Sequence, residues 1–190
     1  MKKINNRFSQ ALDTRKAPQK VCTSMPSLSE DFRTAFRHHP AGVALITANH
    51  DDADYGLTVS SVASLSIDPV AVSFSLTKES GAAGAVLATP SFIIHMLGED
   101  HEQLATNFAV PGAPRFTAEQ GFTRLATGEP YLPSAPVAFR AYLHSSISVG
   151  GSRLIAAEVL EVLTGPHSQH LAYQDRKYLK LSQLSTRVAH

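Results

Sequence analysis

The sequence has 190 residues, and 43% of them are hydrophobic, which is enough for one globular domain with a sizeable core. Because 17 basic residues stand against 16 acidic ones, the formal net charge is only +1, which argues against nucleic acid as a partner. The apolar stretches are far shorter than the roughly 20 residues that span a bilayer, and the polar start lacks a signal-peptide core. We therefore expect a cytoplasmic protein with no membrane partner.

Residues 1–28 carry six basic side chains against one acidic side chain, Asp13, and show no sustained apolar period. They predict a flexible basic tail, or alternatively a transit peptide, ahead of a domain at 29–190. Ser27 and Glu30 have the spacing of a capping box, and the apolar residues that follow predict a short helix that stops before Pro40.

Strands and tight turns dominate the rest of the chain. The expected elements are, in order, a hairpin of strands at 42–48 and 55–59, a strand at 70–76, a helix at 82–88, a strand at 91–97, a helix at 102–108, proline-divided loops at 110–136, and strands at 137–148 and 154–163 joined at Gly150-Gly151. This pattern predicts a mainly β fold, a barrel with a few peripheral helices.

Several common enzyme motifs are missing from the sequence. It has no Gly-x-Gly-x-x-Gly, Walker A, His-Glu-x-x-His or Gly-x-Ser-x-Gly pattern. Its nine histidines show no metal-ligand spacing, so we predict no metal site.

Short hydroxyl side chains are concentrated around the strand at 70–76. They are Thr58, Ser60, Ser61, Ser64, Ser66, Ser73, Ser75, Thr77 and Ser80. A cofactor with a polyhydroxylated chain, a polar ring edge and a phosphate requires such groups, and flavin mononucleotide has these parts. Lys78 and Ser80 lie just before a predicted helix, where exposed N–H groups favour a phosphate. The alternative is that Ser80 only caps that helix.

Two segments, Pro40 to Ala48 and Gly56 to Pro69, together resemble the flavin reductase-like family of FMN-binding split barrels. The resemblance continues to the segment at 173–179 and covers roughly residues 30–180. It implies a six-stranded split β-barrel that forms a homodimer. It also implies an NAD(P)H:flavin oxidoreductase, in which NADH or NADPH passes hydride to FMN or FAD and the reduced flavin supplies a partner monooxygenase.

The resemblance also implies which residues contact the flavin. They are Thr58, Val59, Ser60 and Ser61 along the ring, Ser64 and Ser66 beside them, Ser75, Lys78 and Ser80 at the ribityl chain and phosphate, Arg115 and Phe116 in a loop that closes over the cofactor, and Tyr178 as a nearby aromatic. No catalytic side chain is predicted, because the hydride passes between the two cofactors.

One position departs from the family pattern. Where the family usually has Gly-Asp-His, with the histidine associated with nicotinamide binding, this chain has Gly150-Gly151-Ser152-Arg153. Ser152 and Arg153 are therefore the candidates for nicotinamide contact, although strand alternation points them to opposite faces. The departure leaves two alternatives open: a flavin-binding protein without reductase activity, or a flavoenzyme that acts on an organic substrate.

Overall fold

The structure is a computed structural model that describes residues 27–77 and 80–185. Most of the predicted basic tail, and Lys78, lie outside the described residues. The tail and the domain boundary therefore stay predictions. No helix within the described ranges is long and apolar enough to cross a membrane.

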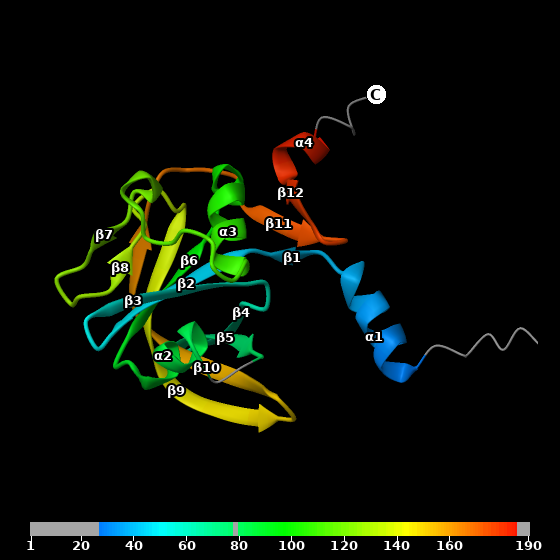
Figure 1. The fold of residues 1–190 in the computed structure, drawn as a ribbon, viewed down its shortest axis with the longest axis horizontal. Helices are drawn as coiled ribbons and strands as arrows, with labels where there is room; N and C mark the ends of the chain where they lie inside the picture. Colours follow the sequence, from blue (N-terminus) through cyan, green and yellow to red (C-terminus); the bar gives the residue numbers. More distant parts are fainter. Residues whose placement is uncertain (1–26, 78–79, 186–190) are drawn as a thin grey trace, which may run out of the picture.

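The described residues form four α-helices, two short 3-10 helices and twelve strands (Figure 1). The helices are α1 (Leu28–Arg37), α2 (Ala82–Ala88), η1 (Glu99–His101), α3 (Glu102–Ala109), η2 (Ala118–Gln120) and α4 (Leu181–Ser185). The strands are β1 (Ala41–Gly42), β2 (Ala44–His50), β3 (Ala53–Val59), β4 (Ala63–Ile67), β5 (Val70–Leu76), β6 (Phe92–Met96), β7 (Thr123–Arg124), β8 (Pro130–Tyr131), β9 (Val137–Val149), β10 (Ser152–Thr164), β11 (Leu171–Gln174) and β12 (Lys177–Lys180).

Helix α1 begins at the predicted capping box. The Glu30 N–H donates to the Ser27 hydroxyl at 3.4 Å, and the Ser27 N–H donates to the Glu30 carboxylate at 2.8 Å. The helix buries none of its residues and lies at the edge of the molecule (Figure 1). Its local signals, and not core packing, therefore specify it.

Seven antiparallel strands form the main sheet, in the order β3-β2-β6-β9-β10-β5-β4. The β2–β3 and β9–β10 hairpins are confirmed, and the latter turns at Gly150, which has φ +57°. A smaller sheet, β1-β11-β12, lies beside α1 and α3, and the sequence reasoning missed both its β11–β12 hairpin and strand β4.

The mainly β prediction is confirmed, but the prediction of six strands is wrong. The hairpin of β4 and β5 adds a strand to the main sheet, because the segment at 63–67 extends along β5 instead of forming a loop. Strands β3 and β4 are the two edges, and the described residues show no pairing between them. Register shifts along β9 and β10 bend the sheet without closing it.

Strand β2 separates the two parts of the core. Ile46 packs with Phe74 and Phe92 in one cluster, whereas its neighbour Leu45 packs with Phe108 in the other, under α3. Because successive side chains of a strand point to opposite faces, β2 must be apolar on both. This explains the apolar run in the sequence at 43–46.

Candidate active site

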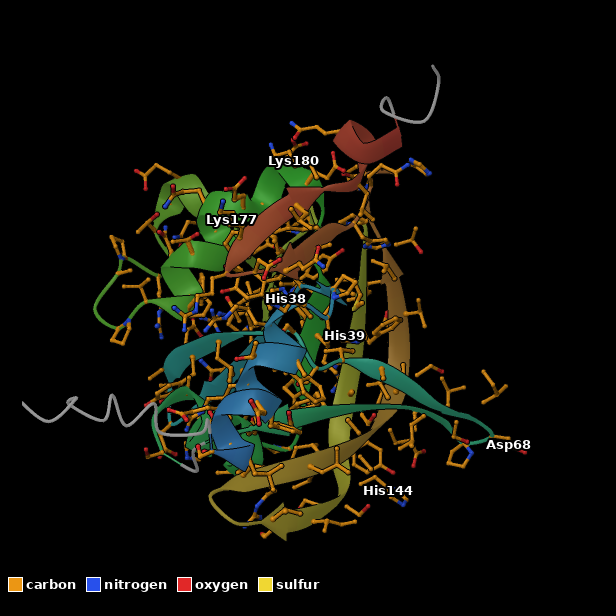
Figure 2. The ribbon with its side chains drawn as sticks, turned by 90° about the vertical axis from the view of Figure 1, so that its right-hand side faces the viewer. His38, His39, Asp68, His144, Lys177 and Lys180 are labelled. Atoms are coloured by element: carbon orange, nitrogen blue, oxygen red, sulfur yellow. The ribbon has the colours of Figure 1, made fainter. Side chains whose placement is uncertain are left out.

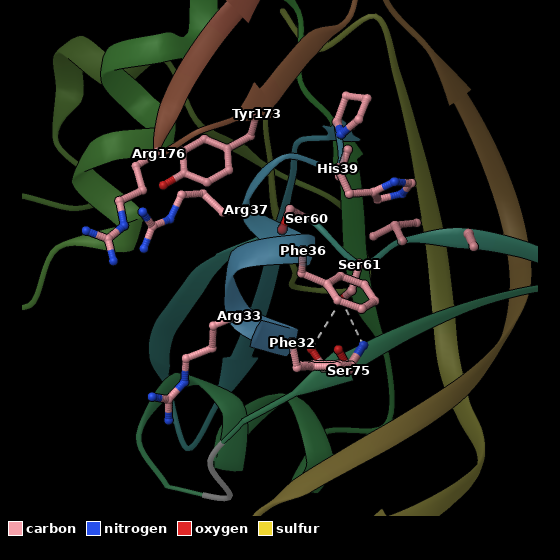
Figure 3. A pocket seen from close by; sticks show the side chains of 15 residues that line it. Phe32, Arg33, Phe36, Arg37, His39, Ser60, Ser61, Ser75, Tyr173 and Arg176 are labelled. Carbon is pink, nitrogen blue, oxygen red and sulfur yellow. Dashed lines mark hydrogen bonds between the residues drawn. The ribbon is translucent and has the colours of Figure 1, made fainter. Parts of the chain in front are cut away.

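A large cavity lies between α1, the β3–β4 connection and the turn between β11 and β12 (Figure 3). It has a volume of about 830 Å³, within the range of small-molecule sites. Three of the predicted flavin residues, Ser60, Ser61 and Ser75, line one wall of it. The sequence prediction therefore identifies one side of this cavity.

Ser61 connects the two segments of that wall. Its hydroxyl accepts a hydrogen bond from the Ser75 N–H at 2.9 Å and lies 3.4 Å from the Ser75 carbonyl oxygen (Figure 3). The Ser60 side chain is exposed and forms no hydrogen bond with other described residues. Ser61 thus positions the connection, and Ser60 offers its hydroxyl to a ligand.

Two smaller cavities continue this site. One of about 160 Å³ shares Ser60 and Tyr173 with the large cavity and is also lined by Thr58, Val59 and Tyr178. Burial raises the pKa of Tyr178, so its phenol is neutral at physiological pH. Its ring lies 5.3 Å from that of Tyr173, between centroids.

The second continuation has a volume of about 480 Å³ and shares Thr58 with the first. Ser80 and Arg115 line it. Gly81 is the N-cap residue of α2, with no side-chain cap hydrogen bond, so Ser80 does not cap the helix. Because neighbouring cavities share lining residues, we call the three cavities together the trough; their lining extends from α1 to the start of α2.

Arg115 holds the loop after α3 in place. Its guanidinium donates to the carbonyl oxygens of Asn107, Gly56 and Val110 at 3.2 to 3.3 Å and lies over the Phe108 ring. Gly56 has to be a glycine here, because an added Cβ would collide with the Phe108 ring. These contacts commit the donors of Arg115 to backbone carbonyl groups, and its predicted role in closing a loop over the cofactor stays a prediction.

The remaining predicted residues lie apart from the trough. Phe116 packs against Phe108 and belongs to the core under α3. Ser64 is exposed on β4, and the Ser66 hydroxyl accepts from the Asp68 N–H at 3.2 Å. The β4–β5 hairpin that carries them projects from the body, with Asp68 at its tip (Figure 2).

Ser152 and Arg153 start β10, next to the end of β5. Arg153 pairs with Leu76 across the sheet and donates to the Ser146 hydroxyl at 3.4 Å. Neither residue lines the three cavities of the trough. Ser152 nevertheless pairs with Val149 and is two residues from Leu154, which pairs with Ser75, so it lies on the same face as the serine wall without lining the cavity.

The chemistry of the trough suits flavin mononucleotide. Hydroxyl groups of Thr58, Ser60 and Ser80 are distributed along it, and the tyrosine pair provides an apolar surface at its centre. A flavin needs such an alternation of polar and flat apolar contacts.

Comparisons with known proteins agree with this flavin-binding chemistry. The model of the family described as flavin reductase like domain matches residues 36–182. The chain belongs to this family. It is 34% identical over 158 residues to an NADH:FMN oxidoreductase of Rhodococcus erythropolis, covering 81% of this chain and 82% of that protein.

Two further comparisons agree, one of sequence and one of fold. The reductase component of a 4-nitrophenol 4-monooxygenase/4-nitrocatechol 2-monooxygenase of Rhodococcus opacus is 33% identical over 164 residues, covering 84% of this chain and 85% of that protein. The crystal structure of a flavin reductase domain protein from Arthrobacter sp. FB24 superposes with a TM-score of 0.74 at 30% identity, covering 80% of this chain and 94% of that one.

Sequence reasoning missed one whole wall of the cavity in this flavin reductase-like domain. Residues from α1, including Arg33 and Arg37, and from the β11–β12 turn, including Arg176, line it opposite the serines. Arg33 and Arg37 are one helical turn apart, and this spacing in the sequence indicates that they share one face of the helix. Nothing local in the sequence brings Arg176 to them.

Proposed function

We propose that this chain is an NAD(P)H-dependent flavin reductase of the cytoplasm that transfers hydride from NADH or NADPH to FMN or FAD and supplies the reduced flavin to a partner monooxygenase. The observation that carries the proposal is the trough, which combines hydroxyl groups with a tyrosine pair. The relatives named as an NADH:FMN oxidoreductase and as the reductase component of a monooxygenase support it.

In this proposal the protein's main task is to hold two flat ligands in contact. The segment from Thr58 to Ser61 binds the flavin ring edge, and the pair of Tyr173 and Tyr178 limits its movement. Arg115 keeps the loop after α3 closed against β3. When bound, the flavin supplies the redox chemistry, because it accepts hydride from the nicotinamide. No side chain has to act as an acid or base in that transfer.

We also propose that the protein is a homodimer and that its curved sheet corresponds to the split barrel of the family. Large apolar side chains are exposed near the cavity: Ile147 (63%), Val149 (70%) and Leu154 (47%). Leu154 lies directly opposite both Ile147 and Ser75 across the sheet, so this patch shares the face of the cavity serines. A second copy that covers it would also shield the cavity from water.

Steady-state kinetics test the proposed reaction. We expect the purified protein to oxidise NADH or NADPH when FMN or FAD is added, at a rate far above that of free flavin. A rate equal to the free-flavin background would contradict the proposal.

The placement of Ser152 favours one alternative, a flavin-binding protein without reductase activity. Ser152 stands where the family histidine would be, and it does not line the trough. Quenching of flavin fluorescence without nicotinamide oxidation would support this alternative.

A further inference from the structure

The wall of the large cavity that faces the serines is strongly basic. Arg33 and Arg37 come from α1, His39 follows that helix, and Arg176 comes from the β11–β12 turn (Figure 3). Among the residues that line this cavity there is no aspartate or glutamate. An anionic ligand is therefore favoured there on charge alone.

The nearby acidic groups leave two of these arginines without a counter-ion. Asp175 pairs with His38 at 2.7 Å, and the described residues form no ion pair with Arg37 or Arg176. Arg33 differs, because its charge acts on the carboxylate of Glu30. The pKa of Glu30 is lowered mainly by hydrogen bonds with Ser27 and, to a lesser degree, by the positive charge of Arg33. Arg37 and Arg176 are the stronger candidates for a bound anion.

A set of contacts fixes the position of Arg37 relative to Arg176. The Asp175 N–H donates to the Arg37 carbonyl oxygen at 2.8 Å, and the Gln174 side-chain amide donates to the His38 carbonyl oxygen at 2.7 Å. The end of α1 is thereby attached to the β11–β12 turn. The two guanidinium groups are presented by a connected scaffold and not by two independent segments.

Arg176 occupies a turn position that usually favours glycine. The strands pair at Gln174 and Lys177, so Asp175 and Arg176 form a two-residue turn, with φ of +51° and +61°. A side chain at a positive φ costs stability. At this position the Arg176 side chain lines the cavity (Figure 3).

Aromatic side chains of α1 also line this cavity. Phe32 and Phe36 have ring centroids 4.6 Å apart, and each residue is 60% exposed. The His39 ring lies 6.1 Å from that of Phe36. Guanidinium groups and an exposed aromatic pair in the lining of one cavity suit a ligand that combines a planar base with phosphates.

We infer that this wall binds the diphosphate of a dinucleotide, with Arg37 and Arg176 pairing with its phosphate oxygens and Phe36 stacking on a base. This inference rests on the proposed function and adds a site for the second substrate, the nicotinamide dinucleotide. The serines of the opposite wall belong to the flavin, so a dinucleotide held here lies beside it. The ADP half of FAD has the same chemistry and is the other possible source of the diphosphate.

Charge-neutral variants test the two arginines. With FMN as acceptor, Arg37→Gln and Arg176→Gln should each raise the KM of the better donor, NADH or NADPH, about tenfold, with the double variant higher still and kcat little changed. Lys177→Gln is the matched control, because it removes the same charge one residue away, outside the cavity. Equal KM values in the arginine variants and this control, for the donor and for FAD, would overturn the inference.

Kinetics with two further substrates identify which ligand supplies the diphosphate. Reduced nicotinamide mononucleotide has no diphosphate, so its KM should not respond to the arginine variants if the site holds the nicotinamide dinucleotide. If the KM of FAD rises while the donor KM measured with FMN stays constant, the site holds the ADP half of FAD. A rise for the mononucleotide equal to that for the dinucleotide would contradict the inference.

Arg176→Gly separates binding from folding. Glycine relieves the positive φ at this turn, so the melting temperature should stay the same or rise while the donor KM increases. A fall in melting temperature together with a rise in KM would point to a structural role and overturn the assignment of Arg176.

A binding measurement separates this inference from the proposed function. NADH has its own fluorescence, so its binding to wild type and to the Arg37→Gln/Arg176→Gln double variant can be titrated without flavin. Weaker NADH binding by the double variant would support the site even if the wild type showed no turnover, in which case the reductase proposal alone would fail. Equal NADH and FAD binding by both proteins would overturn the site.

Discussion

His95 is completely buried on β6, where its ring contacts Leu132 and Phe122 on the α3 side of the sheet. The Leu132 N–H donates to its Nε2 at 3.0 Å, which makes Nε2 the acceptor, so Nδ1 carries the proton and donates to the Leu45 carbonyl oxygen at 3.1 Å. The ring also stacks on Tyr131 at 6.0 Å between centroids. Burial lowers the pKa of His95 to about 4, so the neutral form is required in the folded protein.

This arrangement makes stability depend on pH in the acidic range. The unfolded chain takes up a proton on this histidine near its ordinary value of 6.5, whereas the folded protein resists until about 4. The stabilisation is therefore complete above 6.5 and is lost as the pH falls through the interval between these values. The free energy of unfolding should drop by about 2 kcal/mol between about pH 8 and pH 5.

Urea unfolding at several pH values measures this effect. His95→Gln removes the titrating group and should flatten the curve between the same pH values, at the cost of lower overall stability. An identical pH dependence in wild type and variant would show that other groups cause the acid sensitivity.

At the scale of elements, the connection between β3 and β4 is held to β5 by the Ser61 hydroxyl. Its neighbour Ser60 then lines both the large cavity and the smaller cavity of about 160 Å³ next to it. We therefore attribute to Ser61 the shape of the serine wall, the proposed flavin contact, through its hydrogen bond to Ser75.

Replacing that hydroxyl should weaken flavin binding more than folding. Ser61→Ala loses one hydrogen bond of roughly 1 kcal/mol, so the Kd for FMN should rise about fivefold. Quenching of flavin fluorescence measures the Kd, and thermal unfolding checks the fold. Ser64→Ala is the matched control, because Ser64 is exposed on β4 away from the trough. A larger effect at Ser64 than at Ser61 would contradict the proposed wall.

At the scale of the whole molecule, the apolar patch of Ile147, Val149 and Leu154 predicts the dimer. Ile147→Lys would bury an unpaired charge in the interface and should raise the dimer Kd on the order of 100-fold. Sedimentation velocity measures the shift to monomer, and Ala126→Lys, at an exposed turn between β7 and β8, is the control. A dimer unchanged by Ile147→Lys would remove this patch from the proposed interface.

Local chemistry explains which elements were predictable. The capping box of α1, the β2–β3 hairpin and the glycine turn of β9–β10 each depend on residues that are close in sequence. Strand β4 was not predicted because Ser64 and Ser66 were considered only as flavin contacts, whereas this segment forms a hairpin with β5. The count of six strands failed for this reason.

The candidate site divides in a similar way. By itself, the sequence determined the family, the mainly β architecture and the hydroxyl-bearing wall from Thr58 to Ser61, because these are written in contiguous segments. Only the tertiary structure decided which candidates share a cavity, and it placed Arg176 opposite the serines, beside a helix about 140 residues earlier in the chain. The physical reason is that hydrogen bonds from the Asp175 N–H and the Gln174 side-chain amide to carbonyl oxygens at the end of α1 hold that wall together, and no local pattern specifies such long-range contacts.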